Sequence, residues 1–80
     1  MNRKEVLEEL NVLFRDVLDN DSISLNEETT ANDIEEWDSL AHVQLFDAIQ
    51  KRFQVKISAR EMLSWKNIGE MLDGLMDKMK

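Results

Sequence analysis

The sequence predicts an all-α fold, a small antiparallel bundle of four helices with a short third helix and a long loop after the first. Three observations support this class. The 80 residues contain no proline and only two glycines, a composition that favours helices when Leu, Met, Glu and Lys are common. Apolar residues recur with helical spacing in separate segments, and capping residues precede them. We expect residues 1–80 to form a single domain.

The first helix is predicted to begin after Asn2, which forms a capping-box pattern with Glu5 three residues later. Its apolar stripe consists of Val6, Leu7, Leu10, Leu13, Phe14, Val17 and Leu18. The stripe ends at residues 19–22, DNDS, which prefer turns and caps. A helix of about four turns should therefore open the fold.

Residues 19–38 lack a sustained period, and a connection of this length is unusual in a compact domain and often functional. We expect a loop with a short helical turn near residues 30–33. The loop should be pinned to the bundle by its isolated apolar side chains. These are Ile23, Leu25, Ala31 and Ile34.

The second helix is predicted to begin at Asp38 or Ser39. Its apolar stripe is Leu40, Val43, Phe46, Ile49 and Phe53. The following FQVKIS segment alternates for only two apolar steps and has no evident partner strand, so we expect an extended connector.

Two further capping boxes, Ser58 with Glu61 and Asn67 with Glu70, open the short third helix and the last helix. The stripe of the last helix is Ile68, Met71, Leu72, Leu75, Met76 and Met79.

Composition excludes several classes of function. The chain has no cysteine and a net charge of −7, which excludes disulfides and thiolate metal sites and disfavours nucleic-acid binding. No apolar run approaches the roughly 18 residues of a membrane span, and the N-terminus lacks the apolar region of a secretory signal. We expect a cytoplasmic monomer without a metal site. Charge is unevenly distributed along the chain. Residues 1–38 contain twelve acids and three bases, and residues 39–60 contain four bases and one acid. This distribution indicates either a solvated surface or a docking face with both signs of charge.

Ser39, in the stretch EEWDSLAHV, has three candidate roles. Asp38 or Ser39 could cap the second helix by accepting a backbone N–H bond. Ser39 could be a hydrolytic nucleophile with His42, although no G-x-S-x-G motif is present and a bundle of this size offers no oxyanion pocket. Ser39 could also carry an attached group, because the helix dipole and free N–H groups would stabilise a phosphate ester there.

The DSL motif resembles the attachment site of acyl and peptidyl carrier proteins. The wider EEWDSLAHVQLFDAIQKRFQVKIS segment is similar to the signature of that family, and the likeness extends over essentially the whole chain. The resemblance implies a carrier that is not an enzyme. Ser39 would bear 4′-phosphopantetheine, transferred from coenzyme A by a separate Mg²⁺-dependent phosphopantetheinyl transferase, and the thiol of the arm would hold an acyl, ketide or aminoacyl group as a thioester.

The resemblance also implies roles for neighbouring residues. Asp38 and Leu40 would be recognised by the modifying enzyme. Apart from the resemblance, we expect a partner-binding face that consists of Trp37, His42, Val43, Asp47, Lys51 and Arg52. The implied partners are the transferase, an acyl-loading ligase or acyltransferase, and synthase or condensing enzymes.

The second helix departs from the acidic face of common fatty-acid carriers, which favours a polyketide or other specialised pathway. We expect Trp37 and Trp65 to pack on the ends of the bundle, and His42 to lie on the surface. The main alternative to a carrier is a small acidic helical interaction module in which Ser39 is only a helix cap.

Overall fold

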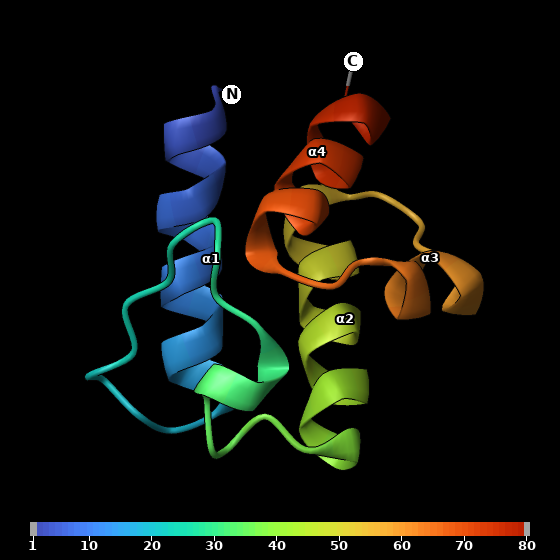
Figure 1. The fold of residues 1–80 in the computed structure, drawn as a ribbon. Helices are drawn as coiled ribbons and strands as arrows, with labels where there is room; N and C mark the ends of the chain where they lie inside the picture. The colour runs from blue at the N-terminus through green and yellow to red at the C-terminus, as the bar shows by residue number, and fades with distance from the viewer. Residues whose placement is uncertain (1, 80) are drawn as a thin grey trace.

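Four α-helices and one 3-10 turn follow one another in the computed structural model, which describes residues 2–79. They are α1 (Arg3–Val17), η1 (Ala31–Asp33), α2 (Ser39–Phe53), α3 (Ala59–Ser64) and α4 (Ile68–Lys78). In Figure 1, α1 and α2 run side by side in opposite directions, and the loop between them returns to the start of α2. α1 packs against both α2 and α4. The predicted all-α class with four helices is confirmed, and no strand occurs within residues 2–79.

Local polar residues define where the helices begin. The capping boxes predicted for Asn2 with Glu5 and for Ser58 with Glu61 are both formed in both directions. In α1, for example, the Asn2 Oδ1 accepts from the backbone N–H of Glu5 at 2.9 Å, and the carboxylate of Glu5 accepts from the N–H of Asn2 at 3.0 Å. These bonds satisfy N–H groups that have no partner within the helix.

The start of α4 differs in one detail from the prediction. Asn67 caps the helix by accepting from the N–H of Glu70 at 2.9 Å. The carboxylate of Glu70 accepts from the backbone N–H of Lys66 at 3.3 Å, one residue earlier than a capping box requires. The predicted helix start is therefore right, while its second bond goes to a different residue.

A single apolar cluster joins the helices. Its fully buried side chains include Val6, Leu10, Phe14, Leu45, Phe46, Ile49, Ile68, Met71, Leu72 and Leu75. The predicted stripes of the first and last helices supply most of this core, in agreement with their helical spacing. None of the helices in residues 2–79 has both the length and the apolar character required to cross a bilayer.

The predicted stripe of the second helix is wrong at its first two positions. Leu40 and Val43 are exposed, while Ala41 and Leu45 are buried in their place. The reason is geometric: each residue advances about 100° around a helix, so repeated steps of three turn the stripe away from the core. Leu40 and Ile49 end on opposite sides of α2, about 180° apart.

The long loop is fixed to α1 by polar as well as apolar contacts. Ile23 and Leu25 are buried as predicted. The side chain of Arg15 donates to the carbonyl of Ile23 at 2.7 Å, and the N–H of Leu25 donates to the side-chain oxygen of Asn11 at 2.7 Å. Ala31, which we expected to pin the loop, is exposed, and no residue of η1 is buried.

The loop is also bonded to α4. The N–H groups of Ile68 and Gly69 donate to the carbonyls of Thr29 and Glu27, at 2.9 and 2.8 Å. Glu27 further accepts from the guanidinium of Arg3 at 2.7 Å. The loop is thus held along its length, which fixes the position of the chain that enters α2.

Candidate functional site

Ser39 is the first residue of α2, and its side chain is exposed. The cap is Asp38, whose Oδ1 accepts from the backbone N–H of Ala41 at 2.8 Å. Among the contacts of residues 2–79, no hydrogen bond holds the hydroxyl of Ser39. The sequence left open which residue is the cap, and the structure assigns that role to Asp38, so the neighbouring hydroxyl is free.

A hollow of about 440 Å³ lies beside Ser39. Three parts of the chain form it: the end of the loop, the first turn of α2, and α3. Its lining residues are Ala31, Trp37, Asp38, Ser39, His42 and Leu63. The walls of this hollow are mainly apolar, and the carboxylate of Asp38 is engaged by the backbone N–H of Ala41.

Trp37 and His42 form a bonded pair across the start of α2. The indole N–H of Trp37 donates to Nδ1 of His42 at 3.0 Å, and the two rings are stacked with centroids 6.0 Å apart. Trp37 also meets Phe14 of α1 edge to face at 5.0 Å, which agrees with its predicted packing role. Burial lowers the pKa of His42 below its usual 6.5, so the imidazole is neutral at pH 7.

This pairing defines the protonation of His42. Since Nδ1 accepts a bond, the proton of the neutral ring is on Nε2. Nε2 is buried and has no partner among the described residues. His42 is therefore half-buried, in contrast to the surface position expected from the sequence, and neither nitrogen bonds to Ser39. The Ser39–His42 arrangement of a hydrolase is not formed.

Three large apolar side chains in α2 and α3 are exposed. Leu40 and Val43 of α2 are 69% and 64% exposed, and Leu63 of α3 is 81% exposed. Most large apolar side chains of this chain are buried. Leu40 and Val43 are about one turn apart on α2, and Leu63 lines the hollow beside Ser39, so these side chains are candidates for contact with a partner.

The charged residues predicted for the partner face form ion pairs. Lys51 contacts Asp47 at 3.0 Å one turn along α2, and Arg52 contacts Glu9 of α1 at 2.6 Å. All four charges lie at the surface, where such pairs exchange readily with water and other charges. The structure thus places Asp47, Lys51 and Arg52 further along α2, away from its first turn.

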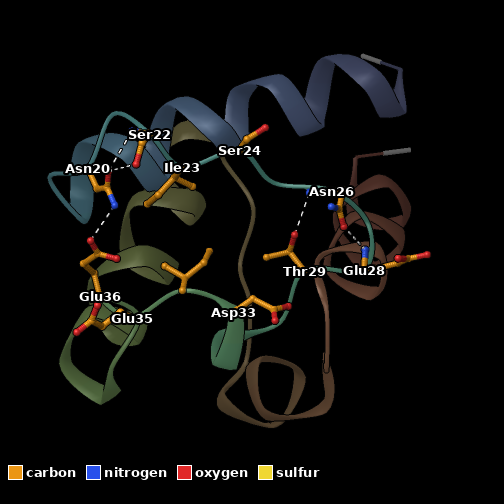
Figure 2. A pocket seen from close by; sticks show the side chains of 11 residues that line it. Asn20, Ser22, Ile23, Ser24, Asn26, Glu28, Thr29, Asp33, Glu35 and Glu36 are labelled. Atoms are coloured by element: carbon orange, nitrogen blue, oxygen red, sulfur yellow. Dashed lines mark hydrogen bonds between the residues drawn. The ribbon is translucent and has the colours of Figure 1, made fainter.

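A second hollow, of about 590 Å³, lies beneath the long loop and is shown in Figure 2. Its polar side chains mostly bond to one another: Asn20 donates to Glu36 at 2.8 Å, and Ser22 donates to Asn20 at 2.6 Å. Thr29 accepts from the N–H of Asn26 at 3.0 Å. These bonds shape the loop. Ser24, which also lines this hollow, is exposed and makes no hydrogen bond within the described part of the chain, but it lies within the loop and not at the N-terminus of a helix as Ser39 does.

Sequence reasoning missed two features of the site, the contribution of Leu63 and the Trp37–His42 bond. Leu63 comes from α3, and its approach depends on the whole fold. The bond had a local signal: Trp37 precedes the cap and His42 is the fourth helical residue, the two positions that often pack together as a staple.

These residues fit a group attached through a phosphate. The hydroxyl of Ser39 is exposed and unbonded, and the first N–H groups of a helix, with the positive end of its dipole, stabilise an anion. The hollow offers apolar walls next to that hydroxyl. When bound, phosphopantetheine supplies a thiol, which this chain lacks because it has no cysteine.

Comparison with known proteins gives the same result. Residues 8–75 match the family described as phosphopantetheine attachment site. The solution NMR structure of a holo acyl carrier protein from Geobacter metallireducens is similar, with 40% sequence identity and a TM-score of 0.85. The alignment covers 91% of this chain and 84% of that protein. No curated protein matches the sequence.

Proposed function

From the premise that this chain belongs to the phosphopantetheine attachment-site family, we propose that it is an acyl carrier protein with its prosthetic arm on Ser39. The observation that carries the proposal is the free, exposed hydroxyl of Ser39 at the first position of α2, next to a separate cap. A residue needed as the cap would be tied to the backbone. Here Asp38 has that task, so the hydroxyl of Ser39 is available to another enzyme.

The modification is a phosphoryl transfer. The oxygen of Ser39 bonds to the phosphorus that carries pantetheine in coenzyme A, the bond from that phosphorus to the adenosine diphosphate part breaks, and 3′,5′-adenosine diphosphate leaves. The hydroxyl proton passes to a base of the transferase or to water. The product is a phosphodiester, whose negative charge lies at the N-terminus of α2, where the helix dipole stabilises it.

As a carrier, the protein would bring a thioester to separate enzymes at raised effective concentration. Leu40 and Val43, with Leu63, would contact the modifying enzyme and later partners. These partners would be an acyl-loading ligase or acyltransferase and the synthase or condensing enzymes of a fatty acid, polyketide or related pathway. We propose the cytoplasm as its location.

Intact-mass measurement tests the attachment site. The protein is incubated with coenzyme A, Mg²⁺ and a broad-specificity phosphopantetheinyl transferase. We expect a mass increase of one phosphopantetheine group in the wild type and in Ser22→Ala, a matched control at an exposed serine of the loop, and none in Ser39→Ala. An unchanged mass of the wild type would instead favour the interaction module in which this segment only begins a helix.

We also propose that the basic residues of α2 contribute to partner docking. Asp47 already neutralises Lys51 within the helix, so its loss leaves the positive charges in place. We expect the double change Lys51→Glu with Arg52→Glu to slow acyl transfer from a partner enzyme more than Asp47→Asn does. Transfer rates at low and high salt measure the effect, because screening weakens docking by surface charge. Equal effects of the two changes would contradict this docking face.

A further inference from the structure

The bonded pair of Trp37 and His42 occupies the two positions of a helix staple. With Asp38 as the cap, Trp37 is the residue before it and His42 is the fourth residue of α2. A staple at these positions fixes the angle at which the chain enters a helix. Ser39 lies between the two members in the chain, so the contact constrains the segment that carries it.

We propose that the Trp37–His42 staple is the positioning element that presents the hydroxyl of Ser39 for modification, and that it forms only while His42 is neutral. This inference rests on the proposed function of Ser39. His42 is a positioning residue, because neither ring nitrogen bonds to the hydroxyl of Ser39: Nδ1 accepts from Trp37, and Nε2 has no partner among the described residues.

The staple is anchored on both sides. Trp37 meets Phe14 of α1 at 5.0 Å, and His42 meets Phe46 of α2 at 4.7 Å. Phe46 in turn meets Trp65, ahead of α4, at 5.9 Å. The segment that carries Ser39 is thus connected to the aromatic core and is not free to swing with the loop.

The dependence on protonation follows from the hydrogen bond. A second proton would occupy Nδ1, so two N–H donors would face each other where the bond had been. Nε2–H is already buried without a partner, so the charged ring would have no acceptor among the described residues. The rings in contact with His42 are uncharged, and Asp38 is the only other titratable group that lines the hollow. Burial alone lowers the pKa of His42, with no contribution from a neighbouring charge.

The first test reads the staple in the unmodified protein. In a Trp65→Phe background, Trp37 is the only tryptophan, so its fluorescence reports the pair alone. We expect the emission to change as the pH falls below 6.5, and the transition to disappear in His42→Gln, whose carbonyl can accept from the indole without titrating. Emission that does not change with pH, or the same transition in His42→Gln, would overturn the pH dependence.

The second test reads positioning through the rate of modification. We expect His42→Ala, and Trp37→Phe, which retains a ring without the N–H, to lower kcat/KM for the transferase by about 10-fold, the scale of a small misplacement of a reacting group. His42→Gln should recover much of the rate lost in His42→Ala. Met79 is half-buried at the end of α4. The change Met79→Ala therefore controls for a general loss of stability.

Comparison of wild type with His42→Gln across pH removes the titration of the transferase itself. We expect the modification rate of the wild type divided by that of His42→Gln to be constant above pH 6.5 and to fall at lower pH. Equal rates in all variants would overturn the positioning role while leaving Ser39 as the attachment site. If the wild type is not modified at all, the proposed function and the positioning role both fail, and the fluorescence test still decides whether the staple exists.

Discussion

Two adjacent residues with similar chemistry have separate tasks at the start of α2. Asp and Ser are both good caps, so residue preference alone cannot assign the role. The backbone decides it: Asp38 is extended, with φ −98° and ψ −173°, which lets its carboxylate reach back to the N–H of Ala41. Ser39 is already helical, and its side chain is exposed beside the hollow.

The assignment of the cap gives a prediction about stability. Asp38→Ala should lower the free energy of unfolding by about 1 kcal/mol, because an N–H at the helix start loses its acceptor. Asp38→Asn should cost less, since the amide oxygen can still accept. Ser39→Ala should have a smaller effect than Asp38→Ala. Urea unfolding of the three variants measures this, and a larger loss in Ser39→Ala would mean that Ser39 is the cap.

At the scale of elements, an aromatic series connects the helices near the site. It runs from Phe14 of α1 through Trp37, His42 and Phe46 to Trp65. Trp65 then lies against α4 at Gly74, where an added Cβ would come within 2.2 Å of the indole. Gly74 therefore lets Trp65 approach the helix, which fixes the connector between α3 and α4.

We expect Gly74→Ala to destabilise the protein, although alanine is the better helix former by about 1 kcal/mol. The methyl group would overlap the indole ring of Trp65 and displace it from Phe46. In a Trp65→Ala background the same change should become neutral or stabilising. Thermal unfolding of the double-mutant cycle measures the coupling. A stabilising Gly74→Ala in the otherwise unchanged protein would contradict the contact.

The elements also show what local sequence determines. Caps and apolar spacing along a helix depend on neighbours within about one turn. The predicted helix starts and the predicted apolar stripes of α1 and α4 are therefore confirmed. The stripe of α2 was misjudged at Leu40 and Val43, whose spacing of three drifts around the helix. The hollow beside Ser39 needs Leu63 from α3. Such a contact depends on tertiary packing, which no local pattern encodes.

At the scale of the whole molecule, surface charges hold distant segments together. Arg3 bonds to Glu27 of the loop and to Asp73 of α4 at 2.7 and 2.6 Å. Lys78 near the C-terminus contacts Glu61 of α3 at 2.7 Å. These partners hold the pKa values of Glu27 and Glu61 below their usual 4.5. These ion pairs thus connect α1 with the loop and α4, and α3 with α4.

The pKa shifts of the molecule predict two steps in its acid stability. The pKa of His42 is lowered, so the unfolded chain binds its proton first, and the free energy of unfolding should fall as the pH drops below 6.5. The lowered pKa values of Glu27 and Glu61 mean that the native state protonates later than the unfolded chain, which gives a second fall below pH 4.5.

A comparison of variants separates these steps from changes in overall charge repulsion. The net charge of −7 is partly neutralised as the pH falls, which raises stability in wild type and variants alike. The difference between wild type and His42→Gln in urea midpoint should therefore shrink as the pH falls below 6.5, because only the wild type has an imidazole at this position. The difference in urea midpoint between wild type and Glu27→Gln should instead mostly disappear below pH 4.5. A His42→Gln difference that stays constant from pH 8 to 4 would show that the imidazole binds its proton equally well in the folded and the unfolded chain, and protonation would then not oppose the staple.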